Sequence, residues 1–175
     1  MSSTVSHPKR LVAAVATAAI ALLTVPLFST PASATINHNI KRTTVTDRAM
    51  NWVKRNVQYS QAGTASDPDG NHTYRRDCSG FVSMAWHITP TGMSAPTTWT
   101  IQGHAHAIAK KNLKRGDILA WPHHHVVLFG KWANSAHTSF WLYEEANPSQ
   151  DMNHRVASLS SYGSYHAWRY NHIVS

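Results

Sequence analysis

The sequence has only one cysteine, Cys78, among its 175 residues. A single cysteine excludes an internal disulfide, and therefore the small secreted folds that several disulfides hold together. Acidic residues are also few, with 8 Asp and Glu against 16 Lys and Arg, so the net charge is +8. Internal repeats and low-complexity tracts are missing as well, and one globular domain is the expected organisation.

A long uninterrupted apolar run is also missing, although the N-terminal part comes close to one. Two basic residues precede a largely apolar stretch over 11–28, which Pro26 interrupts, and the small residues Ala32-Ser33-Ala34 follow. No basic stop-transfer flank is present, so a cleaved secretory signal is favoured over a membrane anchor. We expect a signal peptide over 1–34 and a secreted or wall-associated domain over 35–175, without stable membrane insertion after cleavage.

The basic charge predicts attraction to polyanions, such as anionic cell-wall polymers or an anionic membrane face. Nucleic acid is not an expected partner, because no basic helix and no aromatic-interleaved RNA-binding motif is present. A lone cysteine in an exported chain either pairs with another chain or is a reactive thiol. A monomer with a reactive thiol is the expectation.

Hydrophobic periodicity predicts helices in the first half of the domain. An apolar repeat from Ala49 to Val57 predicts a helix over 46–57, with N-cap candidates at 44–47. A second helix is expected to begin at Cys78 and to end before Pro90. The segment between the helices, 61–72, is polar and contains glycine and proline, which favours a surface loop.

The second half is rich in β-branched and aromatic residues and predicts an antiparallel sheet. A segment within 104–109 is ambiguous and is interpreted as a short helix. Helices followed by strands are typical of an α+β fold rather than of alternating parallel units. The expected strands are 118–121, 125–130 and 138–145, with one or two more within 155–158 and 167–173.

The segment around the cysteine places it where it would be reactive. Asp77 is a plausible N-cap, so Cys78 falls in the first helical turn, where unpaired N–H groups and the helix dipole stabilise a thiolate and an oxyanion. Gly80 is expected to leave room for a substrate backbone beside the sulfur. A buried, inert cysteine at a helix start is the alternative.

A thiolate nucleophile needs a general base, and the run His123–His125 supplies candidates. In an extended chain His123 and His125 share a face and His124 points away. The same run, with His104 and His106, allows a non-enzymatic alternative, a metal-binding or wall-adhesion protein. The usual partner ligands at fixed spacing are missing, so no metal and no cofactor is expected.

Three segments together resemble the NlpC/P60 family of papain-like cysteine peptidases, which hydrolyse cell-wall peptides. Asp77-Cys78-Ser79-Gly80-Phe81-Val82 is similar to the family's nucleophile motif, Leu113–Leu119 to its Leu-x-x-Gly-Asp-Leu turn, and His125–Gly130 to its His-Val-Gly-Ile-Tyr-x-Gly strand. The resemblance covers about 46–148. It implies a papain-like α+β fold, in which N-terminal helices pack on a central antiparallel sheet.

The resemblance implies that Cys78 is the nucleophile and that His125, directly before the apolar strand, is the base. It also implies that Tyr59 and Ser79 contribute to the substrate and oxyanion site. The separation between Tyr59 and Cys78 is longer than in the family, and 65–75 looks like an insertion.

The residue that orients the base departs from the family, where it is most often a histidine. Aligning Ala146 with the family's small residue after the orienting residue places Glu145 in that role, since a carboxylate can hold the imidazole N–H. Glu144 would then point to the opposite face of the strand. Asn147 is the other candidate.

The expected activity is hydrolysis of peptidoglycan stem peptides, by an endopeptidase or amidase, through a thioacyl-enzyme. The resemblance implies a bond next to D-glutamate and diaminopimelate. An acyltransferase or transglutaminase-like enzyme, in which an amine resolves the thioester, uses the same Cys78–His125 pair and stays open.

Overall fold

The first helix, α1 (Arg42–Lys54), begins directly after strand β1 (Ile40–Lys41). It buries one stripe of side chains, with Val45, Ala49 and Trp52 inaccessible to solvent. Its start was predicted too late, because Lys41 is the N-cap and makes no side-chain capping bond. Thr46, one of the expected caps, instead donates from Oγ1 to the Thr43 carbonyl inside the helix. Pairing of β1 therefore sets this helix start.

The second helix, α2 (Cys78–Trp86), begins at the predicted residue, and all nine of its residues are buried. The Asp77 carboxylate accepts a hydrogen bond of 2.7 Å from the Gly80 N–H, as an N-cap does. The helix ends at His87, which is left-handed with φ 58°. The end before Pro90 was also predicted, and the left-handed residue satisfies the last turn in the manner of a C-terminal cap.

The segment predicted as a loop over 61–72 is for the most part a β-hairpin. Strand β2 (Ser60–Ser66) pairs antiparallel with β3 (Thr73–Arg76). The Asp67 N–H donates to the His72 carbonyl at 2.8 Å and closes the turn. Most β2 side chains are exposed or half-buried. The strand therefore lacks the alternation of apolar residues by which a half-buried strand is recognised in a sequence.

Six strands form the main sheet in the order β4-β9-β5-β6-β7-β8, and neighbouring strands are antiparallel. The predicted strands are confirmed within a few residues. The short helix within 104–109 is wrong, because β4 occupies that segment and pairs with β9 at the edge of the sheet. The bounds are β4 (Ala105–Ile108), β5 (Ile118–Trp121), β6 (His125–Trp132), β7 (Ser139–Glu145), β8 (Met152–Ser158) and β9 (His166–Tyr170). The last strand, β10 (Ile173–Val174), pairs in parallel with β1.

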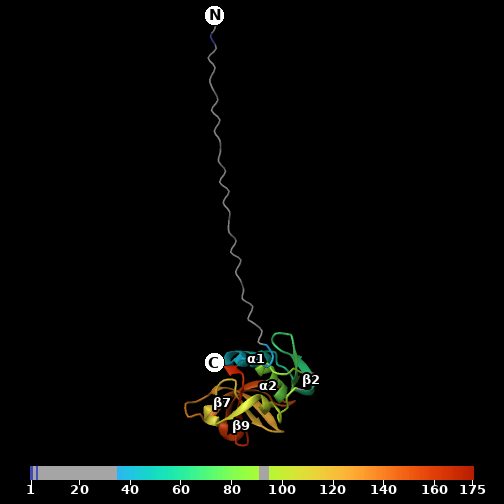
Figure 1. Cartoon of the computed structure of the whole chain (residues 1–175), viewed down its shortest axis with the longest axis vertical. Coiled ribbons are helices and arrows are strands. Elements are labelled where there is room, and N and C mark those ends of the chain that lie inside the picture. The colour runs from blue at the N-terminus through green and yellow to red at the C-terminus, as the bar shows by residue number, and fades with distance from the viewer. Residues whose placement is uncertain (2, 4–34, 91–94) are drawn as a thin grey trace. The chain divides into compact units, whose positions relative to one another are not determined.

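Two buried clusters contain alternate residues of the sheet strands. Val126 and Tyr143 belong to the first cluster, which also contains apolar side chains of α1 and α2. Val127 and Leu142 belong to the second cluster, with residues from the segments that flank the sheet. Alternation along a strand places these two sets on opposite faces. Figure 1 shows α1 and α2 near one another, with β9 further from α1 than α2 is.

The turn before β5 depends on a glycine. Gly116 has φ +84°, and a Cβ there would lie 2.8 Å from the Ile173 side chain. The next residue, Asp117, is inaccessible to solvent and pairs with Arg42 and Arg169 at 3.0 and 2.7 Å. The Gly-Asp motif of the sequence therefore fixes a buried turn that holds α1 and β9 in place.

The computed structural model describes Met1, Ser3 and residues 35–90 and 95–175. Within these residues the architecture is mixed α+β and mostly sheet, with two α-helices and ten strands. The predicted signal peptide over 1–34 lies almost wholly outside the described residues. The part from Thr35 onward belongs to one compact unit. None of the described helices is long and apolar enough to cross a membrane.

Candidate active site

Cys78 occupies the first position of α2 and is 7% exposed. At this position and the next, Ser79, the backbone N–H groups have no acceptor within the helix, and the positive end of the helix dipole lies beside them. Both features stabilise negative charge at the start of α2. The predicted placement of the cysteine at a helix N-terminus is confirmed.

Arg75 is a site residue that sequence reasoning missed. Its guanidinium donates to Asp77 Oδ2 at 2.7 Å, to the Ser79 hydroxyl at 3.0 Å and to the Pro96 carbonyl at 2.7 Å. The Ser79 hydroxyl in turn donates to Asp77 Oδ1 at 3.0 Å. These bonds occupy the Ser79 side chain, so only the backbone N–H of Ser79 remains as a donor for an oxyanion. In the sequence, the feature that could have indicated this role is an arginine two residues before the N-cap.

Gly80 has a different role from the one expected. A Cβ on this residue would lie 2.2 Å from the Arg75 carbonyl oxygen. The glycine therefore allows β3 to cross close to the first turn of α2, and it does not serve to admit a substrate backbone. The close crossing sets the position of Arg75 relative to Cys78.

The three adjacent histidines do not form one extended strand. Trp121 and His125 pair across the β5–β6 hairpin, so His123 and His124 lie in its turn. His123 is left-handed, with φ 64°, and stacks on Trp99 with ring centroids 4.5 Å apart. His124 stacks on Trp121 at 4.0 Å. Only His125 is held by the strand ladder, at the first position of β6.

His125 lies between the cysteine and a carboxylate. It hydrogen-bonds to Cys78, and its Nε2 lies 2.8 Å from Glu144 Oε2. Because Nε2 of His125 contacts the Glu144 carboxylate, the other ring nitrogen, Nδ1, is left to contact the Cys78 sulfur. Burial acts to lower the pKa of His125, but its hydrogen bonds to Cys78 and Glu144 raise the pKa to about 9. The imidazole is therefore held in its protonated, cationic form at neutral pH.

The prediction that Glu145 contacts His125 is wrong, because Glu144 occupies that place. Alternation along β7 puts Glu144 on the face of Leu142 and Glu145 on the face of Tyr143. His125 has the same strand parity as Val127, on the Leu142 face. Alignment of Ala146 with the family pattern displaced the assignment by one residue, which is enough to move a side chain to the other face.

Asn147, the other candidate, does not orient the base either. Its Oδ1 accepts hydrogen bonds from the backbone and the hydroxyl of Ser149, and its Nδ2 donates to Gln150. The side chain therefore stabilises the turn between β7 and β8. Its role is local.

Glu144 is supported on its other side by Arg155, which donates from Nε to Glu144 Oε1 at 2.8 Å. Burial acts to raise the pKa of Glu144, but the His125 and Arg155 contacts outweigh it and hold the pKa below its usual range. Arg155 also donates to the Tyr162 hydroxyl at 3.3 Å. The carboxylate is thus ionised and fixed in orientation, as a group that positions a catalytic imidazole must be.

Glu145 is buried on the opposite face of β7. Its side chain is inaccessible to solvent, and within the described part of the chain neither carboxylate oxygen has a hydrogen-bond partner. Burial, together with the nearby Asp151 carboxylate, raises the pKa of Glu145 to about 8. A neutral carboxyl group is therefore the favoured form at neutral pH.

A pocket of about 320 Å³ opens over the cysteine. Tyr59 and Gln61 line one part of it, and the Gln61 amide donates to the Tyr59 hydroxyl at 3.3 Å. Burial raises the pKa of Tyr59, so its hydroxyl keeps its proton and can act as a hydrogen-bond donor. The predicted site residues Tyr59, Cys78 and Ser79 line the same pocket. The rest of the lining is Arg75, Asp77, Thr97, Thr98, His123 and His124, of which Arg75, Thr97 and Thr98 were not predicted as site residues.

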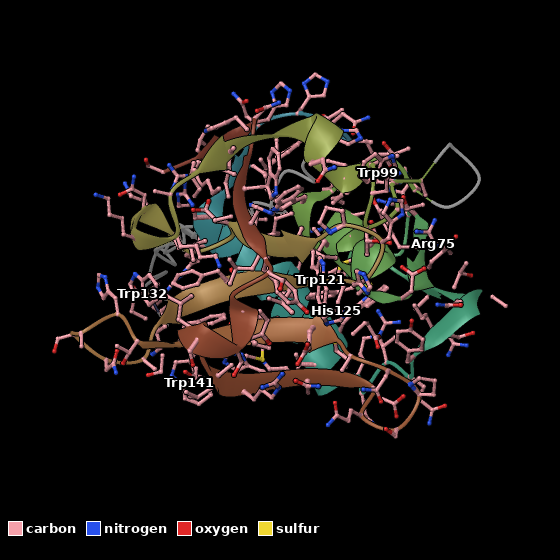
Figure 2. All side chains as sticks on the ribbon, turned by 90° about the horizontal axis from the view of Figure 1, so that it is seen from below. Arg75, Trp99, Trp121, His125, Trp132 and Trp141 are labelled. Carbon is pink, nitrogen blue, oxygen red and sulfur yellow. The ribbon has the colours of Figure 1, made fainter. Side chains whose placement is uncertain are left out.

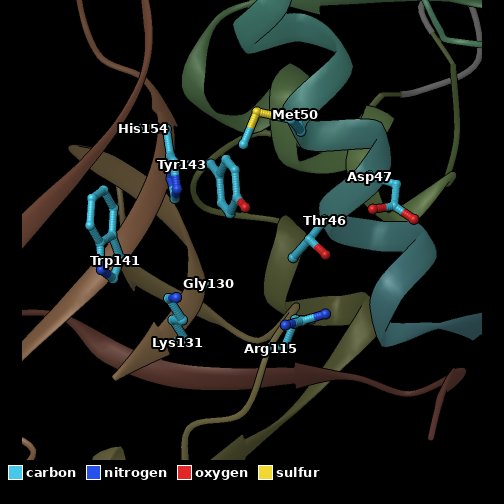
Figure 3. Close-up of a pocket in the computed structure, with 9 residues that line it drawn as sticks. All are labelled: Thr46, Asp47, Met50, Arg115, Gly130, Lys131, Trp141, Tyr143 and His154. Atoms are coloured by element: carbon cyan, nitrogen blue, oxygen red, sulfur yellow. The ribbon is translucent and has the colours of Figure 1, made fainter. Parts of the chain in front are cut away.

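A second pocket, of about 250 Å³, lies between α1 and the strands β6, β7 and β8. Thr46 and Met50 face Tyr143 across it, and Trp141 and His154 lie further along the wall (Figure 3). None of the predicted catalytic residues lines this pocket. In Figure 2, Trp132 and Trp141 lie toward one end of the molecule, and Arg75 and Trp99 toward the other.

The metal alternative based on the histidine run is not supported by the arrangement of these side chains. His123 and His124 are stacked on tryptophans, and His106 bonds to Asn171. In the ranges 35–90 and 95–175, the group of three side chains able to share a metal ion is a different one, made of Asp67, His72 and His87.

No protein-family model matches this chain, and no curated protein matches it. The chemistry of the site must therefore be judged from its geometry. That geometry provides a thiol at a helix N-terminus, a cationic imidazole beside it, and an ionised carboxylate behind the imidazole.

Proposed function

We propose that the protein is a secreted cysteine hydrolase that cleaves peptide bonds in the cell wall. The observation that carries the proposal is the line of contacts from Cys78 through His125 to Glu144. The resemblance of the cysteine, Gly-Asp and histidine segments to the NlpC/P60 family supplies the fold type, papain-like, and the substrate class, peptidoglycan stem peptides.

In the proposed reaction the Cys78 thiolate attacks the scissile carbonyl carbon, so that a C–S bond forms and the carbonyl oxygen becomes an oxyanion. The N–H groups at the start of α2, with the Tyr59 hydroxyl, stabilise this oxyanion. The imidazolium of His125 donates its proton to the departing amine as the C–N bond breaks. A thioester remains on Cys78.

Water completes the proposed reaction. His125, now neutral, removes a proton from a water molecule that attacks the thioester carbonyl. The C–S bond breaks, the acid product leaves, and the imidazolium forms again beside the thiolate. Glu144 holds the imidazole N–H throughout and stabilises its positive charge, without accepting the proton.

The surroundings of the site agree with a wall substrate. The pocket over Cys78 is lined by Arg75, Tyr59 and two threonines, which suit a polar peptide with carboxylate groups. Without Lys9 and Arg10 of the expected signal peptide, 14 Lys and Arg remain against 8 Asp and Glu, and this net charge of +6 attracts the domain to anionic wall polymers.

The proposal is tested by digestion of purified peptidoglycan of several chemotypes, with mass analysis of the released fragments. We expect the unmodified chain and His106→Gln to release peptide fragments with new N-termini, and Cys78→Ala and His125→Gln to release none. Addition of an amine acceptor separates hydrolysis from acyl transfer, since transfer adds the mass of the amine to the product. Equal products from Cys78→Ala, or no products on any chemotype, would contradict the proposal.

A further inference from the structure

Three possible metal ligands meet at the opposite end of α2 from Cys78. Asp67 and His72 come from the turn of the β2–β3 hairpin, and His87 is the C-cap of α2. Asp67 Oδ2 lies 3.5 Å from His72 Nδ1 and 3.6 Å from His87 Nε2. The three ligand atoms all lie within 4.8 Å of one another.

These imidazoles lack the partners that buried polar groups normally have. The His87 side chain is 2% exposed, and neither of its ring nitrogens has a hydrogen-bond partner among the described residues. The same is true of His72 Nδ1. Most buried polar atoms in folded proteins are paired, so an unpaired buried imidazole calls for a ligand or another explanation.

The spacing of the ligand atoms fits a shared ion better than it fits hydrogen bonds. Nitrogen and oxygen ligands at about 2.1 Å from a tetrahedral zinc ion lie roughly 3.4 Å apart. The observed separations of 3.5 and 3.6 Å are close to that value. They are long for an N–H···O hydrogen bond.

The helix dipole and the fixed orientation of the carboxylate also favour a cation. Asp67 Oδ2, the candidate ligand atom, accepts a hydrogen bond of 3.3 Å from Arg48, which donates to Asp69 as well. His87 lies at the C-terminal end of α2, where the helix dipole is negative. The other oxygen of Asp67, Oδ1, accepts from the N–H groups of Asn71 and His72, which fixes the carboxylate in the turn.

We propose that Asp67, His72 and His87 bind one divalent transition-metal ion, with zinc the best match to two imidazoles and one carboxylate. The ion ties the β2–β3 hairpin to the C-terminal end of α2. Strand β3 runs directly into Asp77 and Cys78, so the ion orders the segment that carries the nucleophile without touching the reacting atoms. This proposal does not depend on the proposed hydrolase activity.

The test is a titration of the chain with zinc, after purification without an affinity tag and treatment with a chelator. Cys78→Ser is used as the background, so that the thiol cannot supply a ligand. We expect one zinc ion per chain and a zinc-dependent rise in Tm. Titration with Co²⁺ is expected to give the visible absorption of a tetrahedral site.

His72→Gln is the decisive variant, because His72 is partly exposed and its replacement does not open the core. We expect zinc affinity to fall by at least about 100-fold, with loss of the cobalt absorption and of the Tm rise. His106→Gln, an exposed histidine on β4, is the matched control and should keep all three signals. Stoichiometric zinc binding that His72→Gln leaves unchanged, or no zinc binding by the background chain, would overturn the proposal.

Discussion

Glu145→Gln tests most directly whether the buried carboxyl group of Glu145, at the end of β7, is neutral or ionised. The Glu145 side chain is inaccessible to solvent, and its pKa is raised to about 8, chiefly by burial. Gln has nearly the same shape but cannot ionise. The variant therefore removes the cost of burying a charge and leaves the packing of the carboxyl group almost unchanged.

The size of the effect follows from proton linkage. A pKa of about 8 in the folded chain against an ordinary value of 4.5 corresponds to about 5 kcal/mol, at 1.36 kcal/mol per pH unit. Because the pKa of Glu145 is raised in the folded chain, the free energy of unfolding is highest below pH 4.5, where Glu145 is neutral in both states. It falls by this amount as the pH rises to 8. Glu145→Gln should therefore match the unmodified chain near pH 4.5 and exceed its stability by up to about 5 kcal/mol near pH 9.

The assay is urea denaturation of both proteins at pH 4.5, 7 and 9, with the free energy of unfolding extrapolated to water. Asp47→Asn, which removes an exposed carboxylate, is the control and should change the free energy of unfolding at pH 9 by far less. A Glu145→Gln protein that is less stable than the unmodified chain at pH 9 would refute the reasoning. That result would mean that Glu145 is ionised and held by Arg76, whose Nε is also buried and, within the described residues, unpaired.

Two further changes test the site itself. Glu144→Gln should lower kcat/KM by about 10²–10⁴-fold, whereas Glu145→Gln should keep most of the activity. Loss of the Glu144 carboxylate should also lower the pKa of His125, so the alkaline limit of the pH–rate profile should move down from about 9 toward the ordinary histidine value. An alkaline limit that stays at about 9 would exclude Glu144 as the positioning group. Gly80→Ala should lower the free energy of unfolding, measured by urea denaturation, by about 1–3 kcal/mol, because the added methyl group would lie 2.2 Å from the Arg75 carbonyl oxygen. Gly103→Ala is the control and should lower it little, because there is open space around Gly103. Equal losses in the two variants would contradict the close crossing of β3.

Local signals in the sequence were sufficient for the elements that carry strong periodicity. Asp77 before an apolar helix predicted the N-cap and the start of α2, and β-branched runs predicted β5, β6 and β7. The β2–β3 hairpin was missed, because its exposed polar strands show no apolar alternation. Edge strand β4 was missed for a different reason. It is a strand because it pairs with β9, which lies about sixty residues further along the chain, and a local sequence pattern does not show such a pairing.

The assignment of the carboxylate shows where sequence reasoning reached its limit. Glu144 and Glu145 are adjacent and chemically the same, and the choice between them depends on which face of β7 is turned toward His125. That face is set by pairing with β6, and a displacement of one residue exchanges the two environments. One glutamate became an ionised partner of the imidazole, and the other a buried carboxyl group with a raised pKa.

Sequence alone was enough to place the proposed nucleophile at a helix start, because a single cysteine, its N-cap and the helix that follows are adjacent in the chain. The histidine run offered three candidates for the base, and the family resemblance selected His125 among them. Tertiary structure decided the rest. Only the β5–β6 hairpin separates His125 from its stacked neighbours, and only the meeting of the β2–β3 turn with the end of α2 brings Asp67, His72 and His87 together. Contacts between distant segments depend on how strands pair and helices pack, which local sequence patterns do not specify.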